Sequence, residues 1–186
     1  MALAWLVDFD GTLADTSAAN YLAYAAALRE VDVLVDRAQF DQRAFGRNWR
    51  QFLPLLLTEQ GCGADPAAVA ARKVEHYRGA VADIRFNEAL VFLLRNRSAD
   101  TRTALVTSAS AANVHAALAS RDDLRRLFEV VVTDDDVTRH KPDPQSYAIA
   151  GKLLGVEPAQ CLVFEDSDAG VAAGLAFGAR VLKICF

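Results

Sequence analysis

Five short apolar runs separated by helical patterns constrain the fold of this chain more than any other feature. Most of them are bounded by turn or polar residues, and each has the length of a buried strand. Strands that alternate with helices are typical of an α/β fold with a parallel sheet. The five predicted strands cover residues 3–7, 103–107, 130–133, 161–164 and 180–184.

The interval between the first two runs is too long for an ordinary connection. A crossover between parallel strands needs about a dozen residues or more, whereas residues 8–102 lie between these two runs. Helical patterns fill most of it, at 17–30, 39–46, 47–60 and 66–82. We therefore expect a core of residues 1–14 and 85–186 and an inserted helical subdomain of residues 15–84.

Capping residues mark the ends of several predicted helices. Two of the N-caps are followed by proline, which suits the first helical position. The predicted N-caps are Asp65, Asn87, Asp143 and Ser167, and the predicted C-terminal stops are Gly155 and Gly178.

The composition is that of an ordinary soluble globular protein. The 186 residues fit one domain, or one domain with an inserted subdomain, and 53% are hydrophobic against 24% charged. A net charge of −4 with interspersed signs argues against nucleic acid as a main partner. No apolar segment approaches the roughly 20 residues that span a bilayer, and no signal peptide fits the N-terminus. We therefore expect a cytoplasmic protein without a membrane partner.

The three cysteines lack the spacing of a metal site. Cys161 begins an apolar run and Cys185 ends one, so we expect both in the core or in strands, while Cys62 lies in the inserted segment. Reduced thiols are the expected state.

Two carboxylates follow the first predicted strand, in the DFDGTL segment of residues 8–13. Side chains two residues apart on a strand point to the same side, so we expect Asp8 and Asp10 to face one small volume. Burying unpaired ions is costly, and a divalent cation is the simplest compensation. The alternative is a solvated acidic turn at a strand end.

Polar residues also follow the second and fourth runs, at the sheet edge where open α/β sheets bind ligands. The segment TSAS of residues 107–110 predicts either a phosphate cradle or the N-cap of the next helix. The segment EDSD of residues 165–168 contains Asp166, which can complete a Mg²⁺ site begun by Asp8. Asp168 either favours the helix dipole or contacts a metal through water.

The third run is followed by three aspartates, Asp134 to Asp136, and then by Lys141. The aspartates predict a solvated turn rather than a metal site. Lys141 precedes a proline and therefore lies on an extended segment before a helix. Its ammonium either neutralises a phosphoryl group or the aspartates, or lies on the surface.

Together these elements resemble the haloacid dehalogenase superfamily of phosphohydrolases over the whole chain. Residues 8–13 are similar to its first motif, Thr107 to its second, residues 141–144 (KPDP) to its third, and residues 165–167 with Gly170 to its fourth. The resemblance implies a Rossmann-like α/β core with a parallel five-stranded sheet. The insert at 15–84 is similar to the helical cap of the subgroup that contains phosphoglycolate phosphatases and β-phosphoglucomutases.

The resemblance also implies a mechanism. It predicts a Mg²⁺-dependent phosphatase that hydrolyses a small phosphorylated metabolite, such as a sugar phosphate or a phosphoglycolate-like acid, through an aspartyl phosphate. Asp8 is then the nucleophile and Asp10 the general acid and base. Mg²⁺ is held by Asp8, by the backbone carbonyl of Asp10 and by Asp166, with Glu165 contacting it through water. The implied phosphate-binding residues are Gly11, Thr107, Ser108 and Lys141 in the core and Arg47 and Arg50 in the cap.

Two alternative functions stay open. The resembling β-phosphoglucomutases carry a histidine twelve residues after the nucleophile, where this chain has Asn20; a phosphosugar mutase is thereby disfavoured but kept. Arg47 and Arg50 either grip a second phosphate or belong to a solvated helix face. The second alternative is a non-catalytic phospho-ligand binding protein, which has no need for both Asp8 and Asp10. Asp10 also favours phosphoryl transfer over dehalogenation.

Overall fold

The computed structural model describes residues 4–44, 47–119 and 121–184. The chain forms two compact units. Unit 1 consists of Met1–Asp15 and Arg85–Phe186, and unit 2 of Thr16–Ile84. None of the helices in the described ranges combines the length and apolar character that crossing a bilayer requires.

Unit 1 is built on a parallel five-stranded sheet, which confirms the predicted α/β class. The strand order is β5-β4-β1-β6-β7, so the first strand in the chain lies at the centre. The residues of β1 are paired on both sides, and all except the half-buried Trp5 are buried, because parallel strands between helix layers have two covered faces. The strands are β1 (Ala4–Val7), β4 (Arg102–Val106), β5 (Val130–Val132), β6 (Cys161–Glu165) and β7 (Arg180–Lys183).

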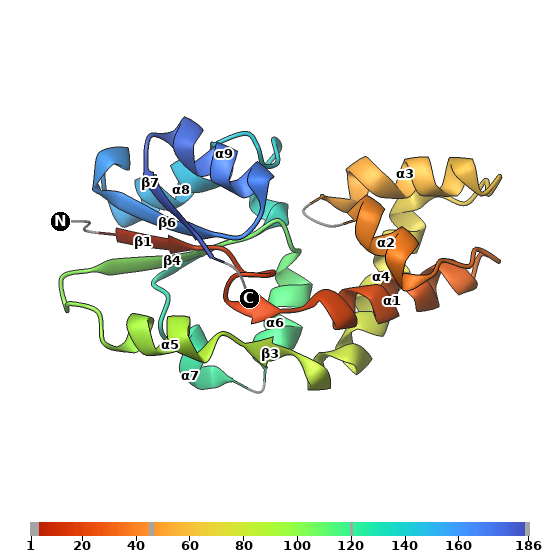
Figure 1. Cartoon of the computed structure of the whole chain (residues 1–186), viewed down its shortest axis with the longest axis horizontal. Helices are drawn as coiled ribbons and strands as arrows, with labels where there is room; N and C mark the ends of the chain where they lie inside the picture. Colours follow the sequence, from red (N-terminus) through yellow and green to blue (C-terminus); the bar gives the residue numbers. More distant parts are fainter. Residues whose placement is uncertain (1–3, 45–46, 120, 185–186) are drawn as a thin grey trace. The chain divides into compact units, whose positions relative to one another are not determined.

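Helices cover both faces of this sheet. In Figure 1, α8 (Gln145–Leu154) and α9 (Asp168–Phe177) lie on one side, and α5 (Glu88–Arg95) and α7 (Asp122–Arg125) lie on the other. The helix α6 (Ala111–Leu118) follows β4, and the 3₁₀ turns η2 (Asp134–Asp136) and η3 (Pro158–Gln160) follow β5 and precede β6. The buried Cys161 belongs to the core between β1, β4, β6 and α8. Cys185 lies outside the described residues.

Most of the predicted caps are confirmed. Asn87 accepts from the Leu90 N–H and Ser167 from the Gly170 N–H, while Gly155 and Gly178 end α8 and α9 in the left-handed conformation. The prediction for α8 was one residue early, because this helix begins at Gln145, after Pro144. The Asp143 carboxylate still accepts a hydrogen bond from the Gln145 N–H at 2.9 Å.

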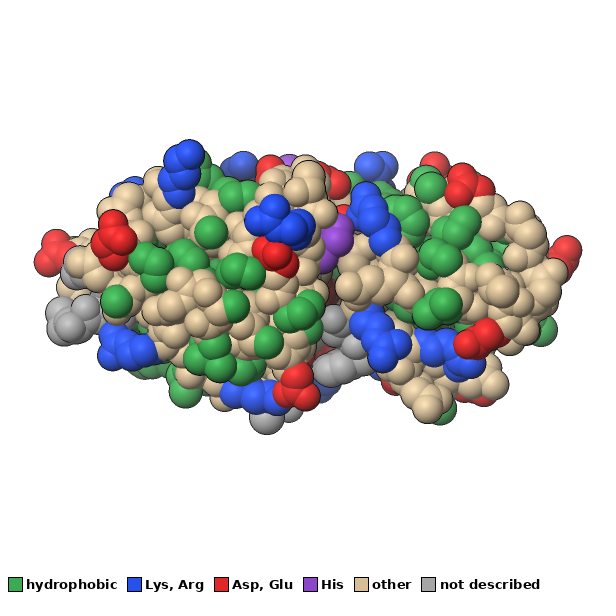
Figure 2. Space-filling view, turned by 90° about the horizontal axis from the view of Figure 1, so that it is seen from above, with side chains coloured by type: hydrophobic (Ala, Val, Ile, Leu, Met, Phe, Trp, Pro, Cys, Tyr) green, Lys and Arg blue, Asp and Glu red, His purple; other side chains and the backbone are tan. Residues whose placement is uncertain are grey.

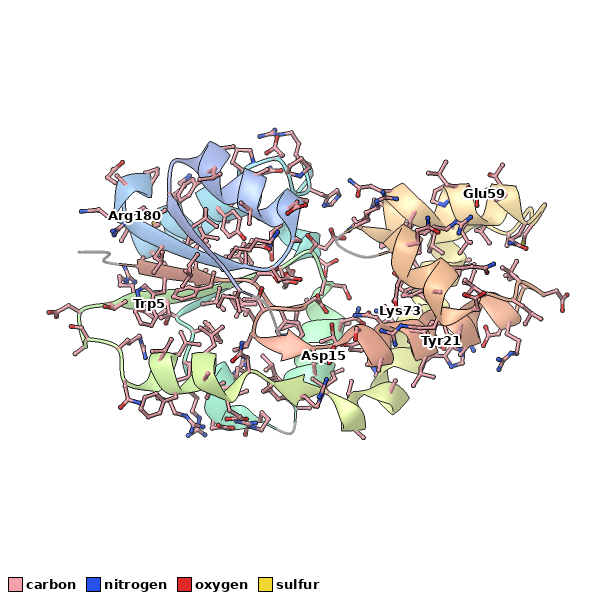
Figure 3. The ribbon with its side chains drawn as sticks, viewed as in Figure 1. Trp5, Asp15, Tyr21, Glu59, Lys73 and Arg180 are labelled. Carbon is pink, nitrogen blue, oxygen red and sulfur yellow. The ribbon has the colours of Figure 1, made fainter. Side chains whose placement is uncertain are left out.

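A two-stranded antiparallel ladder joins the chain segments that lead into and out of unit 2. It pairs β2 (Ala14–Asp15) with β3 (Arg85–Phe86), and Arg85 Nη2 lies 2.6 Å from Asp15 Oδ2. Figure 3 labels Asp15 in β2. The sequence did not predict this ladder, since strands of two residues carry no periodic pattern.

In its described residues, unit 2 is a group of four helices around its own apolar core. The core gathers aromatic and aliphatic side chains such as Phe40, Phe52 and Leu53, and the Asp65 carboxylate caps the fourth helix as predicted. Figure 2 shows basic side chains in blue and acidic side chains in red on the surface of both units. The helices are α1 (Ser17–Arg29), α2 (Arg37–Ala44), α3 (Trp49–Glu59) and α4 (Pro66–Ala80), followed by the 3₁₀ turn η1 (Val81–Asp83).

Candidate active site

The site residues that were predicted at strand ends lie together at the carboxyl edge of the unit 1 sheet. Asp8 directly follows β1, Thr107 directly follows β4, and Glu165 is the last residue of β6. Neighbouring parallel strands end at the same edge, and the register aligns Val7 with Leu105 and Phe164. Residues far apart in the sequence are therefore brought together by the sheet itself.

A buried lysine links two buried carboxylates at this edge. Lys141 Nζ donates to Asp8 Oδ1 at 2.7 Å, to Glu165 Oε1 at 2.6 Å and to the Val106 carbonyl oxygen at 3.2 Å. Lys141 is 8%, Asp8 6% and Glu165 0% exposed. The three protons of the ammonium are thus all engaged. Lys141 is therefore not a surface residue, and its ammonium pairs with Asp8 and Glu165 rather than with the aspartates that follow β5.

The electrostatics of the cluster reflect crowded carboxylates around this ammonium. Burial raises the pKa of Asp8; Lys141 opposes that rise, but Glu165, Asp166 and Asp10 add to it. Burial would lower the pKa of Lys141, yet Asp8, Tyr147 and Glu165 raise it well above its ordinary value. Lys141 therefore stays a cation.

Glu165 accepts hydrogen bonds from several groups around the site. Its Oε1 accepts from Lys141 and from the Tyr147 hydroxyl at 2.9 Å. Its Oε2 accepts from the Asp166 N–H at 3.0 Å and from both the N–H and the hydroxyl of Ser167, at 3.1 and 3.0 Å. Burial alone would raise the pKa of Glu165, but Lys141 and these hydrogen bonds hold it below its ordinary value. Five donors occupy a carboxylate that offers about four lone pairs, so Glu165 stays ionised with no position free for a further direct ligand.

Gly170 explains how this carboxylate fits beneath α9. A Cβ at position 170 would lie 1.7 Å from Glu165 Oε1, closer than any non-bonded contact allows. The glycine of the predicted fourth motif is therefore a packing requirement of the site.

Asp166 lies beside the loop that follows β1. The Thr12 hydroxyl donates to Asp166 Oδ1 at 3.2 Å. Gly11 has a φ of 82°, and a Cβ there would approach Asp166 Oδ2 to 2.2 Å, so this turn requires glycine. Burial, and after it the charge of Glu165, raises the pKa of Asp166 to about 6. Gly11 thus positions the first loop against an acid of the fourth motif.

Carboxylates in this cluster fit a divalent cation. Asp8, Glu165 and Asp166 each offer an oxygen, and the three oxygens lie within 4.8 Å of one another. Carboxylate oxygens suit Mg²⁺, and burial, with the neighbouring carboxylates adding to it, raises the pKa values of Asp8 and Asp166, so a bound cation would stabilise their ionised forms. Because the oxygens of Glu165 are already saturated, Asp8 and Asp166 are the better direct ligands.

The second predicted motif separates into two roles. The Thr107 hydroxyl lies 3.4 Å from Asp10 Oδ2, to which it donates, and it accepts from the Ala109 N–H at 2.9 Å. Ser110 is the N-cap of α6, where its hydroxyl accepts from the Asn113 N–H. Thr107 and Asp10 therefore face each other, and Ser108 lies in the turn between Thr107 and the helix.

The acidic turn after β5 differs from its prediction. Asp135 and Asp136 are exposed, but Asp134 is buried, so the expectation of a fully solvated turn was wrong. Its N–H donates to the Ala109 carbonyl at 2.9 Å, and its Oδ1 lies 2.9 Å from His140 Nδ1. Asp134 is buried because it links the loop after β4 to the segment before Lys141.

Asp168 follows the helix-dipole interpretation. It lies in the first turn of α9, its side chain is exposed, and it accepts from Lys183 Nζ at 2.5 Å. Lys183 holds the pKa of Asp168 below its ordinary value.

The predicted cap residues belong to unit 2. Arg47 and Arg50 are exposed, and the Arg50 guanidinium lies 4.5 Å from the centre of the half-buried Trp49 ring. Asn48, which lies between Arg47 and Arg50 in the sequence, is buried, and its side chain caps α3. Lys73, labelled with Tyr21 in Figure 3, is also buried, and its ammonium lies 4.2 Å from the centre of the Tyr77 ring. Contact of Arg47 or Arg50 with substrate stays a prediction.

Tyr147 is the site residue that the sequence analysis missed. It lies in α8, wholly buried, with its hydroxyl on Glu165 and its ring centre 5.0 Å from Lys141 Nζ. The available signal was a tyrosine six residues after Lys141, directly before the apolar residues 148–150, which resembles ordinary core packing.

The chain matches known proteins in both sequence and fold. A family model described as haloacid dehalogenase-like hydrolase matches residues 4–178, which contain all four motifs. The chain is 31% identical over 179 residues to fructose-1-phosphate phosphatase YqaB of Escherichia coli (strain K12), covering 96% of this chain and 94% of that protein. It is 26% identical over 180 residues to β-phosphoglucomutase of Bacillus subtilis (strain 168), covering 91% and 77%. The structure of CbbY from Rhodobacter sphaeroides in complex with phosphate matches with a TM-score of 0.91 at 26% identity, covering 100% of this chain and 87% of that one.

Proposed function

This chain belongs to the haloacid dehalogenase-like hydrolases, and on that premise we propose that it is a Mg²⁺-dependent phosphatase acting on small sugar phosphates. The observation that carries the proposal is the buried Lys141 bridge between Asp8 and Glu165, with Asp166 beside it. Burying these charges costs desolvation free energy, and apolar residues in their place would let the chain fold without that cost.

Asp8 is the proposed nucleophile. Its carboxylate lies at the end of the central strand, where the backbone is fixed because the Asp8 N–H donates to the Phe164 carbonyl at 3.0 Å. Lys141 holds one carboxylate oxygen at 2.7 Å. A carboxylate oxygen that attacks phosphorus forms an aspartyl phosphate and releases the substrate alcohol, and water then cleaves the acyl phosphate to phosphate and the free carboxylate.

Asp10 is the proposed general acid and base. It is half-buried, and the hydroxyl of Thr107 lies 3.4 Å from its Oδ2. In this role Asp10 gives its proton to the leaving alcohol and later takes one from the attacking water. Thr107, the Ser108 N–H and Lys141 are the proposed partners of the phosphoryl oxygens.

The proposed direct metal ligands are Asp8, Asp166 and the backbone carbonyl of Asp10. Glu165 is proposed to contact the metal through water. When bound, Mg²⁺ supplies positive charge that lets a carboxylate approach an anionic phosphate. The saturated hydrogen bonding of Glu165 argues against its direct ligation, and a metal-bound water that contacts Glu165 would have to replace one of these five donors.

A sugar phosphate is the proposed substrate class. The fructose-1-phosphate phosphatase matches almost end to end, and the β-phosphoglucomutase also matches most of the chain. The mutase relative supports the second candidate, a phosphosugar mutase. We favour the phosphatase because Asn20 occupies the position where the resembling mutases carry histidine; its side chain donates to Thr16 Oγ1 at 3.1 Å.

A substrate panel tests the proposal. Purified protein is incubated with fructose 1-phosphate, glucose 1-phosphate, glucose 6-phosphate and phosphoglycolate, with Mg²⁺ or with a chelator, and phosphate release is measured. We expect release from at least one sugar phosphate, lost with the chelator. Conversion of glucose 1-phosphate to glucose 6-phosphate without release would establish the mutase instead. Activity that persists after Mg²⁺ removal would contradict the proposal.

A further inference from the structure

Tyr147 is a buried titratable residue that the proposed mechanism does not use. It lies in α8, six residues after Lys141, and its side chain is 0% exposed. Burial raises the pKa of Tyr147 well above its ordinary value, so its hydroxyl remains protonated at neutral pH and acts as a donor. The position of the hydroxyl is therefore fixed by its acceptor, Glu165.

The acceptor atom is the same one that anchors Lys141. Glu165 Oε1 receives Lys141 Nζ at 2.6 Å and the Tyr147 hydroxyl at 2.9 Å, whereas Oε2 is occupied by Asp166 and Ser167. The other two protons of Lys141 lie on Asp8 and on the Val106 carbonyl. To hold a phosphoryl oxygen, the ammonium must loosen one of these three bonds.

How readily Lys141 loosens a bond depends on how strongly Glu165 attracts it. A buried carboxylate oxygen that loses one of its two donors attracts the remaining donor more strongly, because no water replaces the lost bond. We propose that Tyr147 is a positioning residue, whose hydroxyl on Glu165 Oε1 limits the pull of Glu165 on Lys141 and leaves the ammonium available to Asp8 and the phosphoryl group.

The variant Tyr147→Phe tests this inference, which rests on the proposed function. It deletes the hydroxyl and keeps the ring beside Lys141. Tyr21→Phe is the matched control, because it deletes a hydroxyl that donates to the Val35 carbonyl within unit 2. Each protein is assayed with Mg²⁺ and p-nitrophenyl phosphate for kcat and KM, and with inorganic phosphate as inhibitor for Ki. The assays run well below the unfolding temperature, which is measured separately.

We expect Tyr147→Phe to raise the Ki for phosphate about tenfold and to lower kcat about tenfold, the effect of one hydrogen bond to a charged group. Tyr21→Phe should match the wild type. Ki is the deciding value, because a variant that merely contained fewer folded molecules would lose rate without changing Ki. A Ki within threefold of the wild type overturns the inference, whatever the unfolding temperature. A wild type inactive on every phosphate monoester overturns the proposed function itself.

Discussion

Unit 1 contains a buried cluster of charged residues, whereas the charged network around Arg72 in unit 2 is exposed. In unit 1, Lys141 and its partner carboxylates are at most 8% exposed. In unit 2, the ion pair of Arg72 with Glu30, at 2.6 Å, has side chains 47% and 36% exposed. Unit 2 also has a buried cation, Lys73, which lies over the rings of Tyr24 and Tyr77.

This difference indicates where function lies. Exposed ion pairs cost little and contribute little, whereas a buried cluster pays for desolvation that folding alone would avoid. The buried charges of unit 1 are therefore the ones to assign to chemistry. Substitutions of charged residues in both units test whether the buried and the exposed groups differ in this way.

The largest effect is expected for Asp8→Asn. The amide keeps the shape of the carboxylate but is a poor nucleophile, so the rate of p-nitrophenyl phosphate hydrolysis should fall by at least about 10³-fold. Lys141 keeps Glu165 as a partner, so the variant should remain folded. Asp168→Asn is the control, because Asp168 is exposed and paired with Lys183; its rate should stay within twofold. A similar loss of rate in Asp8→Asn and Asp168→Asn would contradict a specific role for Asp8 in the reaction.

The next effect is expected for Lys141→Met. Removal of the ammonium leaves Asp8 and Glu165 buried without it, which should cost about 3–5 kcal/mol of unfolding free energy. The phosphatase rate should fall at least about 10²-fold, because a phosphoryl contact is lost as well. Denaturant unfolding and initial rates measure the two effects. A variant as stable as the wild type would contradict the assigned ion pairs.

A pH effect is expected from Asp166, whose pKa is raised from 3.8 to about 6 in the folded protein. A raised carboxyl pKa means that the folded state binds the proton more tightly. Its stabilising contribution is complete below about pH 4 and is lost as the pH rises through about 6. The metal-free protein should therefore lose stability over this window, and Asp166→Asn should show a smaller loss in thermal unfolding. Because Mg²⁺ competes with the proton, the Mg²⁺ concentration for half-maximal activity should fall about tenfold between pH 5 and pH 7. An unchanged slope in Asp166→Asn would contradict the raised pKa.

The smallest effect is expected for Arg72→Met in unit 2. This substitution also removes a cation from two carboxylates, Glu30 and Glu75, but in an exposed network. The unfolding temperature should change by less than about 2 °C, since solvent replaces the lost partners. A loss of stability as large as that of Lys141→Met would contradict the claim that the exposed ion pairs of unit 2 contribute less to stability than the buried pairs of unit 1.

The sequence predicted the architecture of unit 1 because its signals are local and repeated. Each strand is a short apolar run, and each motif follows a strand, so the parallel sheet brings Asp8, Thr107 and Glu165 to one edge. Parallel strands end at a shared edge, which is why the sequence alone could group residues as distant along the chain as Asp8 and Asp166.

What the sequence did not predict depends on three-dimensional packing. Tyr147 resembled a core residue because its partner, Glu165, is on another element. Asp134 resembled a surface acid because its contacts, Ala109 and His140, lie outside its own turn. Burial of a polar side chain is decided by such distant partners, and local composition does not reveal them.

A trapping experiment identifies the residue that receives the phosphoryl group. The wild type is mixed with a sugar phosphate that it hydrolyses and Mg²⁺, quenched during turnover and treated with borohydride, which reduces an aspartyl phosphate to homoserine. Trypsin then releases residues 1–29, the first segment that ends in arginine. We predict homoserine at position 8 in this peptide, and none in enzyme quenched without substrate. Homoserine at another aspartate, or full turnover with Asp8 unmodified, would contradict the assignment of Asp8 as the nucleophile.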